Sequence, residues 1–454
     1  MPDPQPISNR QRKIMERQAE RNREMTAAKR AQTRTPFREA ELQFLSRHPP
    51  PDYSTAIDFR QPADVLLKDP RIKQVPLQKR MSEFSELFGA QDDHTGPEFA
   101  YLHEDHPGLI YIPAGFTPSA QRTLIKACLK QYSRHPNKSN LDTHYLVPDS
   151  GLWDLHENVY TGVQSLEDPA VYVQRKATTD GQPGGYGSDD DDDDDHGDDT
   201  GGDKATNASA APLKTRPKTK PKPTQSSVRT LVPITDETPT VPDNESKNDP
   251  VPSAQVPILP PAQLVRKMRW ITLGYQYHWP SKTYHFDQNA PFPKELSVLS
   301  KAVVEAIDNV SPYPYSAEDF EAEAGVVNYY QLKDRLMGHV DRSELNKDAP
   351  LVSFSFGHSC IYLLGGPTRE TPPTPILLQS GDILAMTGPC RSAFHGVPRI
   401  IEGTLPTYLA ARPDEPEWDI YADYLAEARI NLNIRQVYPS KHQSAQQPLP
   451  SPSS

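Results

Sequence analysis

Short apolar runs separated by turn residues fill the second half of the chain. The strand-like segments are 325–330, 351–356, 361–364, 375–378, 382–386 and 429–437. Glycine-containing turns, at Gly365-Gly366-Pro367 and Ser380-Gly381-Asp382, separate several of them. Many short strands closed by turns predict an all-β core, which is either a barrel or a double-sheet jelly roll.

Two amphipathic helices accompany these strands. Thr117 supplies the N-cap and Pro118 the first helical position of one helix, which follows a strand predicted over 109–112. Apolar residues recur at helical spacing in both: Leu124, Ile125, Cys128 and Leu129 in the first, and Leu296, Leu299, Val303 and Ile307 in the second. We expect both helices to cover one face of the β core, which makes the fold class α+β.

The N-terminal part of the chain differs from this core. Residues 10–34 combine many basic side chains with three glutamates at helical spacing, which predicts a charged helix within an arm over 1–40 that is helical or disordered. The arm is either a basic contact for nucleic acid or a solvated helix. The second interpretation is favoured because short isolated helices are marginal in water. Residues 41–98 are rich in proline and are predicted to form an N-terminal extension.

Residues 180–261 form a third compositional region. It contains seven consecutive aspartates at 189–195, followed by lysines and arginines among prolines and threonines. Such a segment cannot bury enough apolar surface to fold, so we interpret it as a disordered insertion within one catalytic domain that spans 99–179 and 262–438. The acidic tract either mimics nucleic acid and shields a basic site or is a solvated linker. Residues 439–454 are expected to be a disordered tail.

The composition agrees with a core that is smaller than the chain. Hydrophobic residues make up 35% of the 454 residues, and the 49 prolines are about twice the usual ~5% share. The net charge of −11 falls mainly on the nine aspartates of 189–199, and the rest of the chain carries −2. Partners are therefore expected to depend on local charge rather than on the total.

The cysteines and the apolar runs bear on the location of the protein. Cys128, Cys360 and Cys390 are the only cysteines, and they are scattered along the chain. This spacing gives no disulfide framework and no zinc site, and it predicts a reducing intracellular compartment. No apolar run is long enough to span a bilayer, and the start Met1-Pro-Asp-Pro is not that of a secretory signal, so no membrane partner is expected.

A His-x-Asp pair is a candidate metal-binding motif, but it occurs four times. The copies are His103/Asp105, His196/Asp198, His285/Asp287 and His339/Asp341. The first three fall in segments interpreted as polar loops or as the insertion, whereas the fourth follows one strand-like run and precedes several more. On extended backbone, residues i and i+2 face the same way, so His339 and Asp341 can reach one metal ion.

A third ligand must come from another strand. His395 is the better candidate because it follows the intervening strands, and His358, which also ends a strand, is the alternative. Two histidines and one carboxylate can form the facial triad of a non-haem Fe(II) oxygenase, which leaves positions open for O2 and a co-substrate.

The segment 429–437 alternates strictly between polar and apolar side chains. Arg429, Asn431, Asn433 and Arg435 share one face, opposite Ile430, Leu432 and Ile434. Inward-facing arginines are costly unless they pair with anions. The backbones of the two arginines are about 20 Å apart on a strand, so one can hold the far carboxylate of a co-substrate while the other works nearer the metal. The alternative is an edge strand with a solvated face.

Aromatic residues alternate in the same way further upstream. Tyr275, Tyr277 and Trp279 lie close in sequence to Arg269 and Lys282. Aromatic side chains on one strand face beside basic residues suit the stacking of a nucleobase. Packing within an aromatic core is the alternative.

These segments, in this order, resemble the AlkB family of Fe(II)/2-oxoglutarate-dependent dioxygenases, in particular its eukaryotic homologue 1 branch. The matching elements are Asn328-Tyr-Tyr330, His339-Val-Asp341, His395 and Arg429-x-Asn431-x-x-x-Arg435. Longer matching strings are Trp270-Ile-Thr-Leu-Gly-Tyr-Gln-Tyr, His339-Val-Asp-Arg-Ser-Glu-Leu, Ser353-Phe-Ser-Phe-Gly and Arg429-Ile-Asn-Leu-Asn-Ile-Arg-Gln-Val. The resemblance covers about 100–165 and 262–438.

The resemblance implies a double-stranded β-helix and a role for each matching residue. The implied Fe(II) ligands are His339, Asp341 and His395. The residues implied to bind 2-oxoglutarate are Asn328, Tyr330, Asn431, Arg429 on the far carboxylate and Arg435 near the iron end. Asp341 and Arg435 are the implied catalytic residues, and Trp270, Tyr275, Tyr277 and Arg342 are implied to contact the substrate. The 180–261 insertion departs from the family pattern just before this substrate-contacting lid.

The implied reaction is oxidative demethylation of an N-methylated base in tRNA or DNA. It consumes 2-oxoglutarate and O2 and releases formaldehyde, succinate and CO2, and the base must be flipped out or single-stranded. The homologue 1 branch is associated with N1-methyladenine in tRNA, with methylated DNA bases and with a lyase activity at abasic sites, which the sequence does not separate. A catalytically inactive module that binds nucleic acid or protein, and an oxygenase that acts on protein side chains, stay open as alternatives.

We expect a monomer in the nucleus or the cytoplasm. A mitochondrial location stays open, although the glutamates of 10–34 argue against a transit peptide.

Overall fold

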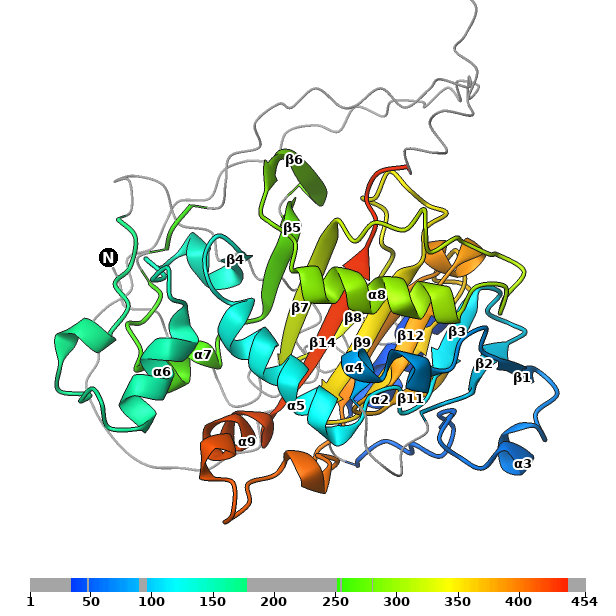
Figure 1. The fold of residues 1–454 in the computed structure, drawn as a ribbon, viewed down its shortest axis with the longest axis horizontal. Coiled ribbons are helices and arrows are strands. Elements are labelled where there is room, and N and C mark those ends of the chain that lie inside the picture. Colours follow the sequence, from blue (N-terminus) through cyan, green and yellow to red (C-terminus); the bar gives the residue numbers. More distant parts are fainter. Residues whose placement is uncertain are drawn as a thin grey trace, which may run out of the picture. The chain divides into compact units, whose positions relative to one another are not determined.

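Two β-sheets form the centre of the structure, which is a computed structural model (Figure 1). It describes residues 34–46, 49–89, 96–177, 251–253, 255–279 and 281–439. Nearly all of the helix predicted near the N-terminus, most of the predicted insertion and almost all of the predicted tail lie outside the described residues.

The larger sheet has ten strands and the smaller sheet has four. In spatial order, the larger sheet consists of β1 (Ile72–Pro76), β2 (Phe99–His103), β3 (Leu109–Ile112), β12 (Ile383–Met386), β9 (Leu351–Gly357), β14 (Ala428–Arg435), β7 (Ala324–Gln331), β5 (Trp270–His278) and β4 (Lys138–Ser139), with β6 (Thr283–Asn289) paired to β5. The smaller sheet consists of β11 (Thr374–Leu378), β10 (Cys360–Leu364), β13 (His395–Ile400) and β8 (Leu336–His339).

Helices lie between the strands along the chain. The α-helices of the described residues are α2 (Pro36–Leu45), α3 (Ala63–Leu66), α4 (Ser85–Phe88), α5 (Pro118–Lys126), α6 (Leu152–Tyr160), α7 (Pro261–Val265), α8 (Lys294–Ala306) and α9 (Asp419–Leu425). Single helical turns occur at Met81–Phe84, Ala127–Gln131, Asn140–Thr143, Pro169–Val171, Gly388–Ser392, Thr407–Leu409 and Pro416–Trp418. None of these helices is long and apolar enough to cross a bilayer.

The outer face of the larger sheet packs against helices. Ile430, Leu432 and Ile434 of β14 are fully buried in the main hydrophobic core, together with residues of α5 and α8. Both helices cover this face in Figure 1. The prediction that the two helices cover one face of the β core is therefore confirmed.

The inner face of the larger sheet packs against the smaller sheet. Tyr111 of β3 and Leu384 of β12 share a hydrophobic cluster with Tyr362 of β10 and Ile400 of β13. On the far side of the smaller sheet, side chains of α2 cover the alternate positions of β10, namely Phe37 and Phe44 over Ile361 and Leu363. The result is a double-sheet jelly roll with flanking helices, which confirms the predicted fold class.

The first predicted helix begins as expected but ends differently. Thr117 caps α5 because its hydroxyl accepts a hydrogen bond from the backbone N–H of Ala120 at 3.2 Å. The α-helix ends at Lys126, and a π-helical turn over Ala127–Gln131 continues it. Cys128 and Leu129 lie in this turn, beyond the α-helix. Both are buried, as their spacing predicted.

The N-terminal extension is joined to the core more closely than its composition indicated. β1 lies within the stretch predicted as an extension, yet it pairs with β2 over its whole length as part of the larger sheet. α2, which begins in the predicted arm, packs on the smaller sheet. No break in the sheet corresponds to the boundary placed after residue 98, because β1 and β2 pair across it.

The end of the predicted insertion is also structured in part. The described chain stops at 177 and resumes at 251. Val256 is buried, and the hydroxyl of Tyr145 donates a hydrogen bond to the carbonyl of Pro257 at 2.7 Å. Residues 255–261 therefore pack onto the domain, although their proline content had placed them in the insertion.

Phe354 tests the packing between the larger sheet and α5. This side chain is fully buried, and its ring meets that of Phe116 edge-on at 5.2 Å. We expect Phe354→Ala to lower the free energy of unfolding by about 3–5 kcal/mol, because it leaves a cavity in a packed core. Phe99→Ala, at a side chain 41% exposed on β2, should cost about 1 kcal/mol or less. Urea unfolding of both variants measures the difference, and equal losses would contradict the packing described.

Candidate metal and 2-oxoglutarate site

Three side chains with metal-binding atoms meet at one end of the smaller sheet. His339 ends β8, Asp341 follows two residues later, and His395 begins β13. β8 and β13 are neighbours, with His395 directly opposite His339. The ligand atoms of the three residues lie within 4.8 Å of one another, and the imidazole centroids are 4.4 Å apart.

The orientation of the two imidazoles fits a metal ion. The Nδ1 atom of His339 lies 2.9 Å from the carbonyl oxygen of Met337, and the Nδ1 atom of His395 lies 3.1 Å from that of Ala393. A carbonyl accepts a hydrogen bond only from a protonated nitrogen, so each Nε2 is left with its lone pair for a metal. The Nε2 atom of His339 lies 3.8 Å from Oδ1 of Asp341. Two imidazoles and one carboxylate suit Fe(II).

The electrostatic surroundings hold His395 and Asp341 in their metal-binding protonation states. Burial, followed by the neighbouring His339, lowers the pKa of His395 to about 4, so His395 is neutral at neutral pH. Burial raises the pKa of Asp341, but positive charge nearby, above all that of Arg435, outweighs this effect and keeps the pKa well below its usual value.

A buried network of charges surrounds Asp341. Nη2 of Arg435 lies 3.3 Å from Oδ2 of Asp341, and Nη1 of Arg435 donates a hydrogen bond to Glu344 at 2.8 Å. Arg391, also buried, forms an ion pair with the second oxygen of Glu344 at 3.5 Å. The sequence interpretation missed Glu344 and Arg391. Glu344 lies in the string that begins at His339, whereas Arg391 belongs to no pattern that could have singled it out.

The predicted 2-oxoglutarate ligands lie side by side on the larger sheet. In the antiparallel pairing of β14 with β7, Asn431 is directly opposite Asn328, and Arg429 is directly opposite Tyr330. Paired residues in a sheet project to the same face. That face is the inner one, because the alternate residues of β14 pack against the helices. The structure therefore brings these four residues together between the two sheets.

Arg429 has the surroundings expected of an anion-binding arginine. Its side chain is buried, and its guanidinium donates hydrogen bonds to the carbonyl of His358 at 2.9 Å and to the hydroxyl of Ser355 at 2.8 Å. Both acceptors are uncharged, and Nε has no hydrogen-bond partner in the described part of the chain. A buried guanidinium without a carboxylate is costly unless an anion joins it. The far carboxylate of 2-oxoglutarate fits this requirement.

Two tryptophans and a tyrosine gather beside this face. Trp270 of β5 is directly opposite Asn328 of β7. The ring centroid of Trp270 lies 5.2 Å from that of Trp279, which lies 4.9 Å from that of Tyr277. The hydroxyl of Tyr277 is 3.4 Å from that of Ser343, two residues after Asp341. This aromatic trio (Trp270, Tyr277 and Trp279) therefore lies beside both the 2-oxoglutarate residues and the metal-binding group.

The other two predicted substrate residues lie outside the trio. Tyr275 packs against Tyr438, with ring centroids 5.4 Å apart, in an aromatic cluster beside β6. A register irregularity follows Tyr275, and Gly274 before it has a φ of 70°, where a Cβ would lie 2.0 Å from the carbonyl oxygen of Glu323. Only glycine fits there. Arg342 is exposed and adjoins Asp341 in the chain.

The competing histidines have other contacts. Nε2 of His358 lies 3.0 Å from the carbonyl oxygen of Ala426. His103 ends β2, and both His285 and Asp287 lie within β6, so the expectation of loops was wrong for these three residues. His285 packs against His278, with ring centroids 4.7 Å apart. β6 had been missed because its polar residues mask the period-two pattern.

Comparisons with known proteins agree with this geometry. The family model described as the 2OG-Fe(II) oxygenase superfamily matches residues 223–435. The mouse protein named nucleic acid dioxygenase ALKBH1 is 32% identical over 356 residues, which cover 74% of this chain and 66% of that protein. The tRNA demethylase abh1 of Schizosaccharomyces pombe is 40% identical over 178 residues, which cover 39% of this chain and 55% of that protein.

A third relative is matched over most of its own length. The protein named N6-methyladenosine RNA demethylase ALKBH, from Cryphonectria parasitica, is 31% identical over 210 residues, which cover 43% of this chain and 88% of that protein. Fold and site together define a non-haem iron oxygenase of the jelly-roll type. The chain belongs to the AlkB family of Fe(II)/2-oxoglutarate-dependent dioxygenases. It spans just under two thirds of the mouse relative and about half of the fission yeast relative.

Asp341 is the charged member of the metal-binding group. We expect Asp341→Ala to abolish turnover and to weaken the binding of Mn(II), used as a probe for the site, because two imidazoles alone do not complete the triad. Calorimetric titration of Mn(II) checks the binding. His285→Ala is the matched control, since that histidine belongs to a His-x-Asp pair outside the group, and it should bind Mn(II) as the unaltered protein does. Full activity of Asp341→Ala would refute the assignment.

Glu344 is expected to be a structural requirement of the site. Burial raises the pKa of its carboxyl, but Arg435 offsets this and the pKa lies below its usual value, so the group is ionised. Glu344→Ala leaves two buried guanidinium groups without this partner and should lower the free energy of unfolding by about 3–5 kcal/mol. Glu98→Ala, which removes an exposed ion pair with Arg80, should cost about 1 kcal/mol or less. Urea unfolding distinguishes the two, and a loss no larger than that of Glu98→Ala would contradict the network.

Proposed function

We propose that this protein is an Fe(II)/2-oxoglutarate-dependent oxidative demethylase of N-methylated bases in tRNA, DNA or both. The observation that carries the proposal is Arg429, a buried guanidinium without a described carboxylate partner, on the same sheet face as Asn328 and Asn431. This arrangement provides for a dicarboxylate beside a group that suits Fe(II). The family and the printed names of the relatives support a nucleic-acid substrate.

The chain's residues divide the work of holding the cofactors. His339, Asp341 and His395 would hold Fe(II), and Arg429, Asn431, Asn328 and Tyr330 would hold 2-oxoglutarate. Together with O2, the bound iron and 2-oxoglutarate supply the oxidation of the N-methyl group, with release of formaldehyde, succinate and CO2.

Arg435 keeps the metal-binding carboxylate in position. It faces both Asp341 and Glu344, so it neutralises charge that the two acids would otherwise confine together between the sheets. In the proposal it also lies nearer the metal end of the co-substrate than Arg429 does. The two arginines of β14 thus have separate roles, which agrees with their spacing along the strand.

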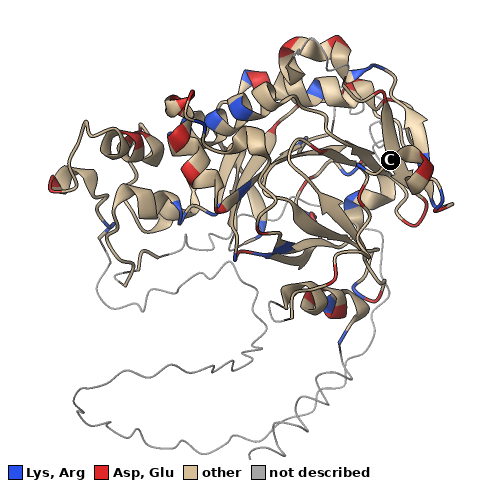
Figure 2. Ribbon diagram, turned by 90° about the horizontal axis from the view of Figure 1, so that it is seen from below, with Lys and Arg blue, Asp and Glu red and all other residues tan. Residues whose placement is uncertain are grey.

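The aromatic trio is the proposed contact for the base. Indole and phenol rings offer faces on which any base can stack, which suits a base that is flipped out or single-stranded. Figure 2 shows basic and acidic residues interspersed along the outer helices. In the proposal, recognition therefore relies on the aromatic trio and on individual basic side chains such as Arg342. It does not rely on a broad surface of positive charge.

A methyl-release assay tests the function. Purified full-length protein with Fe(II), ascorbate and 2-oxoglutarate is incubated with N1-methyladenine tRNA, with methylated single-stranded DNA or with methylated peptides. We expect formaldehyde and succinate in equal amounts from a nucleic acid and none from the peptides. Asp341→Ala should release neither, which controls for contaminating enzymes.

The other outcomes correspond to the alternatives. Release of formaldehyde from peptides alone would identify an oxygenase of protein side chains. No succinate with any substrate, in protein that is folded and loaded with iron, would leave a binding module and contradict the proposal. Mass spectrometry of tRNA and DNA from cells with and without the protein then identifies the base.

An intracellular location and a monomeric state are also part of the proposal. The three cysteines are free and buried, which suits a reducing compartment. Light scattering of the purified protein tests the monomeric state. Microscopy of a tagged copy tests whether the protein lies in the nucleus, the cytoplasm or the mitochondrion.

A further inference from the structure

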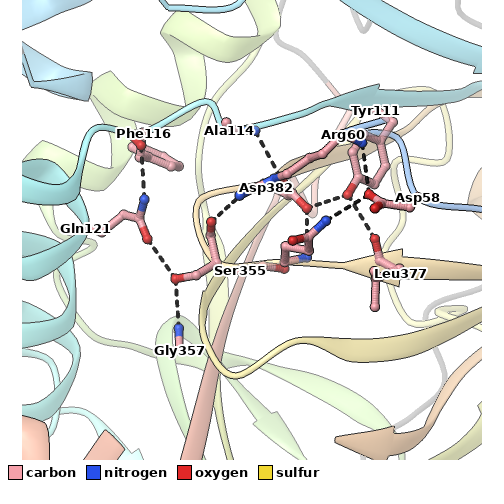
Figure 3. A network of polar contacts seen from close by, with 12 residues as sticks. Asp58, Arg60, Tyr111, Ala114, Phe116, Gln121, Ser355, Gly357, Leu377 and Asp382 are labelled. Carbon is pink, nitrogen blue, oxygen red and sulfur yellow. Dashed lines mark hydrogen bonds and ion pairs between the residues drawn. The ribbon is translucent and has the colours of Figure 1, made fainter. Parts of the chain in front are cut away.

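Another buried carboxylate lies away from the metal-binding group, at the connection between the two sheets. Asp382 is fully buried in the turn that joins β11 of the smaller sheet to β12 of the larger one (Figure 3). Its carboxylate accepts hydrogen bonds from the backbone N–H of Gln379 at 2.7 Å and of Ala114 at 2.9 Å, and from the hydroxyl of Tyr111. Together with a charged partner, four residues of the chain thus contact this carboxylate.

That charged partner comes from the N-terminal segment. Nε and Nη2 of Arg60 lie 2.9 and 2.7 Å from one oxygen of Asp382, and Nη2 also reaches the carbonyl oxygen of Ser380 at 2.5 Å. Asp58 holds the segment in place, since it accepts hydrogen bonds from the backbone N–H of Arg60 at 3.0 Å and from the side chain of Gln379 at 2.8 Å. A residue outside the family-like segments therefore neutralises a buried charge of the jelly roll.

The turn that contains Asp382 also fixes the end of β9. The backbone N–H of Ser355 donates to the carbonyl of Asp382 at 3.1 Å, and the N–H of Gly381 donates to the carbonyl of Ser355 at 2.6 Å. The N–H of Gly357 donates to the hydroxyl of Ser380 at 3.0 Å, and that hydroxyl also contacts Gln121 at 2.7 Å. Ser355 is therefore held on both sides of its peptide by the turn that Arg60 contacts.

Ser355 is the link to the co-substrate site. Its hydroxyl accepts one of the two hydrogen bonds that orient the buried guanidinium of Arg429. A continuous series of contacts thus runs from Arg60 through the 380–382 turn and Ser355 to Arg429. Partners of this kind, one step removed from the ligand, control how accurately a binding group is held.

We propose that Arg60 is a positioning residue for 2-oxoglutarate. It holds the turn that fixes Ser355, and Ser355 sets the orientation in which Arg429 meets the far carboxylate. This inference rests on the proposed function for the identity of the co-substrate. It makes the N-terminal segment a determinant of co-substrate affinity.

Calorimetric titration of 2-oxoglutarate into the full-length protein loaded with Mn(II) tests the inference without turnover. Arg60→Ala should raise the Kd for 2-oxoglutarate about tenfold, the lower end of what such outer partners cost at metal sites. The Kd for Mn(II) should stay unchanged. In the demethylase assay, KM for 2-oxoglutarate should rise while kcat at saturating 2-oxoglutarate stays unchanged. Loss of folded protein alone would instead lower kcat and the binding stoichiometry, and it would leave Kd and KM unchanged.

Two further variants keep the test informative if the alanine variant does not fold. Arg60→Lys keeps the charge but not the forked contact with Asp382 and Ser380, so it should keep the fold and still raise the Kd. Arg60→Ala combined with Asp382→Asn removes the buried charge and should recover stability without recovering affinity. Arg71→Ala is the matched control, because it removes an arginine of the same segment whose ion pairs, within the described residues, are with Asp69 and Asp105 at the surface.

A double-mutant cycle with Ser355→Ala examines the path itself. If Arg60 acts through Ser355, the two single changes each weaken 2-oxoglutarate binding and the double change weakens it little further. Additive effects, or an Arg60→Lys protein that binds 2-oxoglutarate as tightly as the unaltered protein, overturn the inference. Failure of the unaltered protein to bind 2-oxoglutarate would instead overturn the proposed function, so the two failures are distinguishable.

Discussion

The confinement of charge between two sheets is the constraint on which this structure depends. β14 projects Arg429 and Arg435 inward, and burying either guanidinium without an anion is costly. Arg435 meets that need with Asp341 and Glu344, and Glu344 in turn faces Arg391. Arg429 has only neutral acceptors among the described residues, which makes it the place where an outside anion completes the site. The same requirement of charge balance therefore explains why Arg435 has acidic partners within the protein and why Arg429 suits an anionic ligand.

The two sheets contribute different halves of the site. The smaller sheet supplies the candidate metal-binding group through the pairing of β8 with β13. The larger sheet supplies the residues proposed to hold 2-oxoglutarate through the pairing of β7 with β14. Packing between the sheets brings the halves together, and the turn around Asp382 connects them a second time. Arg60 at that turn shows that residues far from the chemistry take part in holding the two halves in register.

The sequence was most informative where a strand alternates. Ile430, Leu432 and Ile434 have a period of two, and the structure places them against the helices with the arginines on the opposite face. It was least informative at β8 and β13, which are short and hold glycine or proline, so their pairing of His339 with His395 could not be read from local pattern. The extension before residue 98 was misjudged for a related reason. Its apolar residues are few, but the pairing of β1 with β2 incorporates it into the larger sheet all the same.

By itself the sequence determined the kind of core and the faces of its regular strands, and its family resemblance proposed the residues for iron and a dicarboxylate. These follow from local periodicity and from ordered motifs, which need no knowledge of distant contacts. Only the tertiary structure decided which residues balance the buried charges. Arg391 and Arg60 are charged residues in segments without a distinctive pattern. Glu344 and Asp382 lie in a family-like string and in a turn motif, but neither pattern indicates the charged partner of the residue. Their partners are chosen by how separate strands and turns pack in space, and packing of that kind leaves no local trace in the sequence.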